Sequence, residues 1–242
     1  MKRDNSTFRK KVAVRQLVLS QAASPVVMET HGGEGKLFNA CYSHIERGVV
    51  FEKSWQKAEL LARQRPTWAV YASDCIAALQ LGAGRHLPVN LLDVDPYGDP
   101  WPVIDAFLTS ERPRPENLYI VVNDGLRQNI RLGTAWTVET LKPIVRRYGN
   151  NLYDKYLDVC FALMGEKAAQ AGYSLRRFDG YYCGFQEQIT HYYAVLHRRS
   201  DSGGGQPEQG ASFRLETAAT PKMSRPHGAA PSRVQCATRP TA

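Results

Sequence analysis

The sequence predicts an α/β domain built on a doubly wound, seven-stranded sheet, mostly parallel with an antiparallel last strand. Five short apolar runs alternate with helical patterns between residues 25 and 123. Successive β-α units of this kind build a parallel sheet with helices on both faces. Two further strand-like runs between residues 174 and 199 are joined by a short connection. A connection of that length predicts an antiparallel pair.

The predicted strands are short runs rich in β-branched and aromatic residues, as buried strands are. They cover residues 25–30, 48–52, 68–72, 89–94, 117–123, 174–182 and 190–199. The predicted helices cover residues 8–22, 36–46, 54–64, 74–81, 100–108 and, with a break near Gly149, 137–171. Ser54 is a suitable N-cap, and Pro100 and Pro102 suit the first turn of a helix.

The chain of 242 residues divides into three predicted segments. Residues 1–24 are expected to form a basic helical segment, and residues 25–199 the main α/β domain. From about residue 200 the apolar periodicity disappears, and Ser, Pro, Ala and Gly become frequent. A segment of that composition buries too little apolar surface to fold, so residues 200–242 are predicted to be a disordered tail.

The net charge of +8 favours a partner that carries phosphate groups. Residues 1–15 alone hold six Lys or Arg against a single Asp. Many basic proteins bind no nucleic acid, so the charge by itself leaves this partner open.

The five cysteines are widely spaced and form no C-x-x-C pair. This spacing argues against a disulfide framework and against a zinc site, so we expect a cytoplasmic protein without a metal. No apolar run approaches the roughly 18 residues that are needed to span a bilayer. We therefore expect no membrane segment.

Glycines and acids follow three successive predicted strands. The stretch 29–38 carries a glycine-rich turn, Glu52 comes about 20 residues later, and Asp74 follows the third strand. Ligands of open α/β sheets bind beyond the carboxyl ends of the strands, where Glu52 could accept ribose hydroxyls and Asp74 an adenine amino group. The alternative is that each acid caps the next helix, as Asp74 could. A nucleoside pocket of this kind does not separate nicotinamide from S-adenosylmethionine.

Two motifs then carry a resemblance to a known family. ETHGGEG (29–35) resembles the D-x-F-x-G-x-G motif of class I S-adenosylmethionine-dependent amino-methyltransferases, with Glu29 as the leading acid and His31 in place of the aromatic. LDVDPYGDP (92–100) is most similar to the D-x-D-P-[YF]-G-x-P segment of the tRNA guanine-N2 dimethyltransferase family. The resemblance covers about residues 25–125 and implies that the Rossmann-like domain of residues 25–199 is catalytic.

The resemblance implies S-adenosyl-L-methionine as the cofactor. The residues expected to contact it are Glu29, His31, Gly33, Gly35, Glu52, Asp74 and Asp93. A structural hydrogen-bonding role explains Asp93 equally well, and His31 could simply be a packing residue.

Asp95, Pro96 and Tyr97 are the expected catalytic residues. The lone pair of an exocyclic base amine is delocalised into the ring, and its nitrogen becomes positive as it takes a methyl group. Asp95 and the Pro96 carbonyl could accept its N–H bonds, and Tyr97 could stack on the base. Asn123 is a second expected substrate contact, although a turn-forming Asn-Asp-Gly is a slightly better explanation of it.

The predicted function is methyl transfer to an exocyclic amine of a nucleic-acid base, with guanine N2 of RNA favoured and DNA possible. The tRNA family carries a large C-terminal domain where this chain has a low-complexity tail. We therefore also expect substrates other than tRNA, or presentation of the substrate by a partner protein. The alternatives are a methyltransferase for a protein or small molecule and a non-catalytic subunit that binds cofactor or nucleic acid. A nicotinamide oxidoreductase is disfavoured, because hydride transfer has no use for D-P-Y-G.

Overall fold

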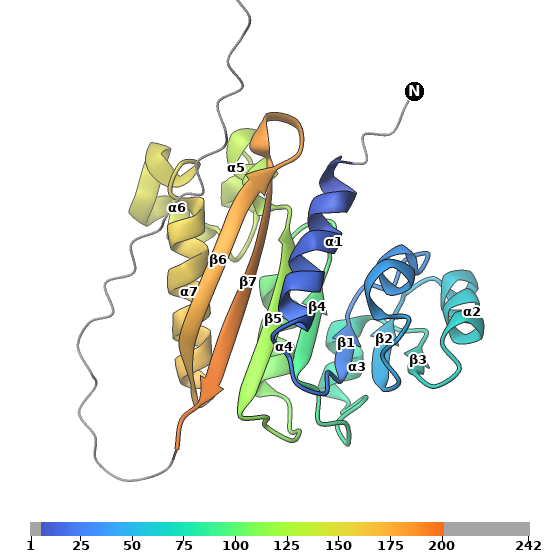
Figure 1. Ribbon diagram of the computed structural model, residues 1–242. Helices are drawn as coiled ribbons and strands as arrows, with labels where there is room; N and C mark the ends of the chain where they lie inside the picture. Colours follow the sequence, from blue (N-terminus) through green and yellow to red (C-terminus); the bar gives the residue numbers. More distant parts are fainter. Residues whose placement is uncertain (1–5, 201–242) are drawn as a thin grey trace, which may run out of the picture. The chain divides into compact units, whose positions relative to one another are not determined.

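The structure is a computed structural model that describes residues 6–200 (Figure 1). Most of the predicted tail therefore lies outside the described residues. In the described part of the chain, seven strands form one sheet in the order β3-β2-β1-β4-β5-β7-β6. Their bounds are β1 (Val27–Glu29), β2 (Gly48–Phe51), β3 (Ala69–Tyr71), β4 (Leu91–Val94), β5 (Asn117–Asp124), β6 (Tyr173–Cys183) and β7 (Ile189–Arg198).

The pairing of the strands confirms the predicted topology. Strands β1 to β5 are parallel to one another. Strand β7 lies between β5 and β6 and is antiparallel to both. All five parallel strands end at the same edge of the sheet, which we call the carboxyl edge.

The helices largely follow the prediction. They are α1 (Ser6–Leu19), α2 (Trp55–Gln64), α3 (Cys75–Gln80), α4 (Trp101–Thr109), α5 (Leu126–Arg131), α6 (Lys142–Tyr148) and α7 (Tyr156–Gln170), with 3₁₀ turns η2 (Ala135–Thr137), η3 (Gly149–Leu152) and η4 (Phe185–Glu187). Helix α5 was not expected from the sequence. The predicted break near Gly149 is present, and Gly149 has the positive φ of 54° that ends a helix.

The helix expected over residues 36–46 is instead a π-helical turn, η1 (Phe38–Tyr42). This short turn buries Phe38, Cys41 and Tyr42. π-Helical turns are rare and occur often at functional sites. Here the turn brings the Tyr42 hydroxyl to Asp93 at the carboxyl edge.

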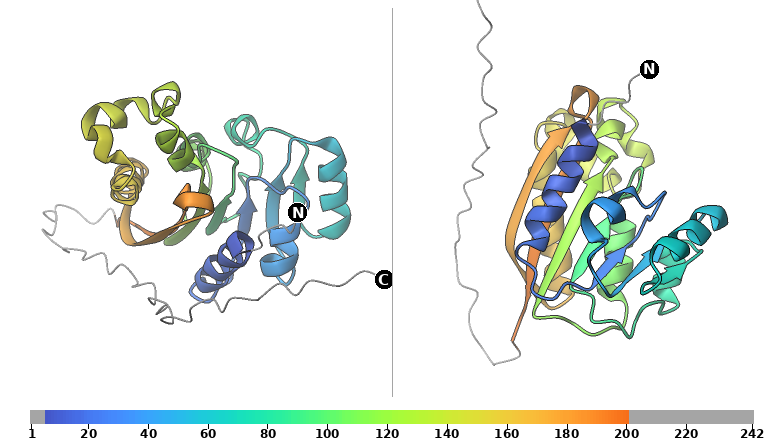
Figure 2. Two further views of the ribbon diagram at one scale, coloured as in Figure 1. Left: turned by 90° about the horizontal axis from the view of Figure 1, so that it is seen from above. Right: turned by 45° about the vertical axis from the view of Figure 1, so that its right-hand side comes forward.

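Two hydrophobic cores lie on the two faces of the sheet. Because side chains alternate along a strand, Leu118, Ile120 and Val122 of β5 join one core, and Tyr119 and Val121 join the other. Helices α3, α4, α6 and α7 contribute to the first core, and α1, η1 and α2 to the second. Figure 2 shows α1 and α7 on opposite sides of the sheet.

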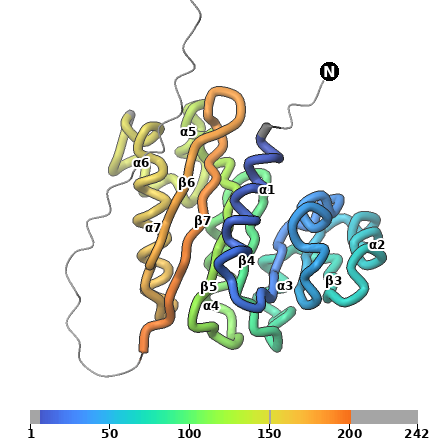
Figure 3. Tube along the Cα trace, in the orientation of Figure 1, coloured from blue at the N-terminus to red at the C-terminus, as the bar shows by residue number. Residues whose placement is uncertain are grey.

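Helix α1 belongs to the predicted basic segment and packs on β5, β7 and η1. Its Val18 is fully buried, and the Tyr119 hydroxyl donates to the carbonyl of Gln21 just beyond its end. The helix begins near the turn between β6 and β7, at the carboxyl edge (Figure 3). Its first turns therefore lie beside the strand ends.

Candidate functional site

Four of the predicted acids gather around one histidine at the carboxyl edge. Asp95, Asp93, Glu52 and Asp74 are all close enough to His31 to favour its charged form. Burial outweighs them and lowers the pKa of His31 below its ordinary value. The loops that follow β1, β2, β3 and β4 therefore meet at one place, as the sequence predicts.

The glycine-rich loop folds back onto the end of β2. The Gly33 N–H donates to one oxygen of Glu52 at 2.8 Å, and the Ser54 N–H donates to the other at 2.9 Å. A side chain at Gly32 would lie 2.6 Å from Val50, so only glycine fits there. Space beside Gly33 is open, with no atom within 4 Å of the position that a Cβ would take. The loop is thus packed against β2 at Gly32 and open to a ligand at Gly33.

Asp74 caps a helix, as the alternative interpretation of the sequence proposed. Its carboxylate accepts the Ala77 N–H at 3.0 Å as the N-cap of α3 and pairs with Lys53 at 2.6 Å. The hydrogen bonds from Lys53 and from Ala77 lower the pKa of Asp74. Asp74 remains partly exposed. A carboxylate has lone pairs beyond those used here, so the cap leaves room for a ligand contact.

Glu29, the leading acid of the first motif, is enclosed. It pairs with Arg65 at 2.5 Å, and the side chains of both residues are buried. The Arg65 guanidinium lies 4.1 Å from the centre of the Phe38 ring and 5.2 Å from that of Trp68. Burial raises the pKa of Glu29 to about 8, although Arg65 opposes the shift. The carboxylate therefore faces protein and not the open side of the loop.

Asp93 is enclosed in a similar way. Arg15 of α1 donates to both carboxylate oxygens, at 2.7 and 2.5 Å, and the Tyr42 hydroxyl donates to one of them at 2.7 Å. Asp93 and Arg15 are both buried. These contacts match the structural role that the sequence left open for Asp93. Glu29 and Asp93 are adjacent across β1 and β4, and we call them the inner row.

The Asp95-Pro96-Tyr97 loop lies one step further out. Asp95 is paired with Lys11 of α1 at 2.6 Å, and their side chains are 14% and 20% exposed. Pro96 is buried, and Tyr97 is fully exposed. The Gly125 N–H donates to the Gly98 carbonyl at 3.1 Å, which ties this loop to the end of β5. A side chain at Gly125 would come within 3.1 Å of the Tyr97 carbonyl oxygen, so the close approach favours glycine.

Asn123 lies beside Asp95 in a row that crosses four strands. Val94 pairs with Val122, so Asp95 and Asn123 are the next residues along β4 and β5. Asn123 pairs with His191 of β7, and His191 pairs with Tyr181 of β6. We call Asp95, Asn123, His191 and Tyr181 the outer row. It lies on the α1 face, because Lys11 bonds Asp95 and Lys10 lies 5.5 Å from the centre of the Tyr181 ring.

Sequence reasoning missed His191, Tyr181, Lys11 and Arg15. His191 is 2% exposed, and its Nδ1 lies 3.0 Å from the Tyr181 hydroxyl. Burial, with help from Lys11 and Arg15, lowers the pKa of His191 to about 3, so the ring is neutral at physiological pH. A histidine at the start of the otherwise apolar run 191–196 was the signal that could have identified it.

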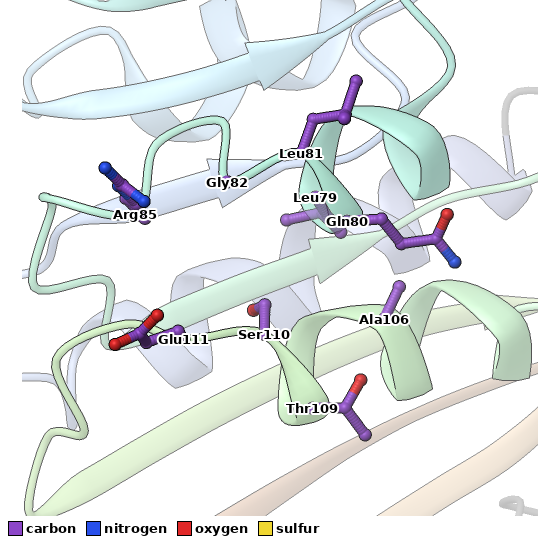
Figure 4. Close-up of a pocket in the computed structure, with 9 residues that line it drawn as sticks. All are labelled: Leu79, Gln80, Leu81, Gly82, Arg85, Ala106, Thr109, Ser110 and Glu111. Atoms are coloured by element: carbon purple, nitrogen blue, oxygen red, sulfur yellow. The ribbon is translucent and has the colours of Figure 1, made fainter.

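Other features lie away from this edge. A cavity of about 360 Å³ lies between the ends of α3 and α4 and is lined in part by Leu81, Arg85 and Glu111 (Figure 4). Both helices start at the carboxyl edge and run back along the sheet, so this cavity is at the opposite edge. Among residues 6–200, no cluster of three His, Cys, Asp or Glu side chains could hold a metal ion. No helix in that range is long and apolar enough to cross a membrane.

Comparison with known proteins finds similarity in structure. No protein-family model and no curated protein matches the chain. Trm1 from Pyrococcus horikoshii, in complex with S-adenosyl-L-methionine, matches 78% of this chain at 15% identity and a TM-score of 0.58. The match covers 54% of the Trm1 chain, so this chain spans about half the length of that protein.

Two further solved structures are similar. The N-methyltransferase NodS from Bradyrhizobium japonicum WM9, in complex with S-adenosyl-L-homocysteine, matches 82% of this chain and 90% of its own at 13% identity, with a TM-score of 0.52. TYW2 from M. jannaschii, in complex with AdoMet, matches 82% of this chain and 79% of its own at 10% identity, with a TM-score of 0.52. Together with the strand order and the antiparallel β7, these similarities show that the chain has the fold of class I S-adenosylmethionine-dependent methyltransferases.

Proposed function

We propose that this chain is an S-adenosylmethionine-dependent N-methyltransferase that acts on an exocyclic amine of a nucleic-acid base, with guanine N2 of RNA favoured. The observation that carries the proposal is the contact between Asp95 and the Lys11 ammonium, at 2.6 Å. It occurs in the D-P-Y loop, two residues before the exposed aromatic side chain of Tyr97. The carboxylate thus already holds a positively charged nitrogen.

The residues of the carboxyl edge fit the nucleoside part of the cofactor. Glu52 is half-buried beside the open position at Gly33, and Asp74 is partly exposed at the end of the neighbouring strand. Glu52 would accept the ribose hydroxyls and Asp74 the adenine amino group, through lone pairs that their backbone partners, and Lys53 in the case of Asp74, leave free. Glu29 and Asp93 are enclosed and would act by holding the loops in place.

When bound, S-adenosylmethionine would supply a methyl group on positively charged sulfur. The amine nitrogen would form the new bond to this methyl carbon as the carbon–sulfur bond breaks, and the Asp95 carboxylate would be in place to take the proton that the nitrogen loses. Asp95 stabilises the positive charge that develops on this nitrogen, as it stabilises the Lys11 ammonium. The Pro96 carbonyl accepts a second N–H bond, and proline restricts the loop that presents it. Tyr97 stacks on the base and fixes its orientation.

Charge and shape support a nucleic-acid substrate. The chain has a net charge of +8, and Lys10 and Lys11 lie at the amino-terminal end of α1 beside the outer row. An exposed aromatic next to basic side chains is a common platform for an unpaired base. A base in a duplex would have to flip out of its stack to reach Asp95.

Two measurements test this function. Calorimetry should detect binding of S-adenosylhomocysteine but not of NAD. Incubation with methyl-labelled S-adenosylmethionine should then transfer the label to unmodified tRNA, rRNA or DNA. Nucleoside analysis of the product would identify the base and the atom that carry the methyl group. Label on a protein or a small molecule, with none on nucleic acid, would point to the alternative substrate class. Binding of NAD in place of S-adenosylhomocysteine would exclude the proposal.

A further inference from the structure

Two buried polar atoms of the outer row have no hydrogen-bond partner among the described residues. They are Oδ1 of Asn123 and Nε2 of His191. Asn123 is 8% exposed and His191 is 2% exposed. Polar atoms buried in this way are rare in folded proteins, because leaving them unbonded destabilises the fold. The described residues hold nine such atoms, and these two stand out because they belong to paired residues of neighbouring strands at the carboxyl edge.

A second Asn–His pair in the same two strands provides an internal comparison. Asn117 pairs with His197 at the other end of β5 and β7. There, the imidazole Nδ1 and the Asn117 Oδ1 lie 3.0 Å apart and form a hydrogen bond. At the carboxyl edge, the equivalent ring nitrogen is used by Tyr181 instead. The Tyr181 contact thus keeps His191 from bonding Asn123 in the same way.

The Tyr181 hydroxyl also determines what His191 can offer. A phenol that donates to Nδ1 leaves the proton of a neutral imidazole on Nε2. The ring is neutral because burial keeps its pKa low. We assign the donor role in the 3.0 Å contact to the Tyr181 hydroxyl, which makes Nε2 of His191 a hydrogen-bond donor. Oδ1 of Asn123 is an acceptor. From β4 to β7, the outer row therefore presents two hydrogen-bond acceptors, Asp95 and Asn123, followed by one donor, His191.

We propose that Asn123 and His191 recognise the ring edge of the base whose amine binds Asp95, and that they select a cyclic amide. This inference rests on the proposed function. The edge of guanine presents an amine, a ring N–H and a carbonyl oxygen in that order, which complements acceptor, acceptor and donor. Adenine and cytosine present a ring nitrogen acceptor next to the amine, which would face the Asn123 oxygen and be repelled.

Lys11 marks the place of the amine in this arrangement. Its ammonium occupies the Asp95 carboxylate at 2.6 Å, at the partly exposed end of the outer row. The incoming amine replaces that ammonium, and displacement of the Lys11 side chain opens the way for the ring edge to reach the buried atoms of Asn123 and His191. Tyr181 acts as a positioning residue, because it sets the tautomer of His191 without touching the base.

The test is a binding measurement on the full chain with S-adenosylhomocysteine present. The probes are four oligouridylates that carry one central guanosine, 2-aminopurine riboside, adenosine or cytidine. 2-Aminopurine keeps the amine of guanine but lacks the carbonyl and the ring N–H. We expect the guanosine probe to bind about 10- to 100-fold more tightly than the 2-aminopurine probe, as expected when one or two buried polar groups lose their partners.

The variants separate recognition from folding. His191→Phe and Asn123→Leu should bring the guanosine and 2-aminopurine affinities close together, whereas His191→Gln, which keeps a donor, should retain part of the preference. Tyr181→Phe should weaken the preference for guanosine, because it removes the hydroxyl that bonds His191 and keeps the aromatic ring. His197→Phe, at the other end of the same strand pair, is the matched control and should leave the preference for guanosine unchanged. Thermal unfolding of each variant verifies that it is folded.

The results distinguish this inference from the proposed function. Equal binding of the four probes, no binding of any, or a preference that persists in both His191→Phe and Asn123→Leu would overturn the recognition by Asn123 and His191. Suppose that the preference for guanosine depends on Asn123 and His191 but that no nucleic acid is methylated. This result would count against the proposed reaction and would support recognition of the base by Asn123 and His191.

Discussion

Arg15 of helix α1 donates two hydrogen bonds to the buried carboxylate of Asp93, at 2.7 and 2.5 Å. One turn earlier in the same helix, Lys11 pairs with Asp95. Residues four apart share a face of a helix, and residues two apart share a face of a strand. Four helical residues rise about 6 Å and two strand residues about 6.6 Å, so the two pairs are in register. Helix α1 is therefore joined to the end of β4 by two matched charge pairs.

Replacing Arg15 should destabilise the fold strongly. Arg15→Met leaves the carboxylate of Asp93 buried without its cation, which typically costs about 3–5 kcal/mol. The double variant Arg15→Met with Asp93→Asn should recover part of this loss, because the uncompensated charge is gone. Urea unfolding of the wild type, both single variants and the double variant measures the coupling. Additive effects of the two substitutions would contradict a direct pair.

Removing the ammonium of Lys11 should raise the catalytic efficiency for the nucleic-acid substrate. In Lys11→Met, Asp95 is free to accept the amine without first losing a partner, so we expect kcat/KM for nucleic acid to rise several-fold. Lys10→Met is the matched control, since it removes the same charge one residue away, where the side chain lies over Tyr181. That control should lower kcat/KM by weakening attraction to phosphate. A fall of the same size in both variants would mean that Lys11 does not compete for Asp95.

Asp95 should be required for methyl transfer and dispensable for cofactor binding. Asp95→Ala should abolish transfer, and Asp95→Asn should reduce it by roughly 10²- to 10³-fold, since an amide accepts the N–H but carries no compensating charge. Calorimetry with S-adenosylhomocysteine should give nearly the wild-type affinity in both variants. Full activity in Asp95→Ala would refute the assignment.

The ring of Tyr97 should matter more than its hydroxyl. The side chain is fully exposed, so its removal leaves the fold intact. Tyr97→Ala should weaken single-stranded nucleic-acid binding by roughly 10- to 100-fold, which corresponds to one lost base–aromatic stack. Tyr97→Phe keeps the stacking surface and should bind like the wild type. Fluorescence anisotropy with a labelled oligonucleotide distinguishes the two, and equal affinities for all three proteins would rule out stacking.

Asp124 should make the stability of the fold depend on pH. It is fully buried, with the Leu126 N–H and the Tyr156 hydroxyl on its oxygens at 2.8 and 2.9 Å. Burial raises its pKa from 3.8 to about 7, so the folded chain holds this proton more tightly than the unfolded chain. Its contribution to stability is present below pH 3.8 and is lost as the pH rises to 7, by roughly 1.4 kcal/mol per pH unit.

The variant Asp124→Asn cannot ionise. Its free energy of unfolding should therefore decline less steeply than that of the wild type between about pH 4 and 7. Urea unfolding at several pH values gives the two slopes. Asp158→Asn, which alters an exposed carboxylate, is the control and should keep the wild-type slope. Parallel curves for Asp124→Asn and the wild type would show that Asp124 is ionised throughout this range.

The sequence predicts the five parallel strands well, because each one is a short apolar run with a clear boundary. It also predicts that acids gather at the carboxyl edge, since parallel strands place successive ends together. It does not predict which acids are enclosed. Arg15 and Asp93 are 78 residues apart, and Arg15 looks like an ordinary charged residue of a basic helix until the helix is placed on the sheet.

Asp95 and Asn123 were expected site residues, but His191 and Tyr181 of the outer row were missed for a related reason. The pairing of Asn123 with His191 depends on the register of β5 and β7, and a shift of one residue would turn His191 to the other face. Helix α5 was missed because it is short and follows an Asn-Asp-Gly sequence that is typical of a turn. For Arg15 and His191, the missing information is the three-dimensional position of one element relative to another.

The two matched charge pairs also bear on the speed of substrate entry. Arg15 is buried and held by Asp93, so it fixes the axis of α1, whereas Lys11 is partly exposed and can rotate about its own side-chain bonds. Releasing Asp95 then requires a rotamer change, which takes picoseconds to nanoseconds, and not the microseconds to milliseconds of a moving helix. Base binding should accordingly follow the rate of encounter with the nucleic acid, with no slow opening phase in stopped-flow traces.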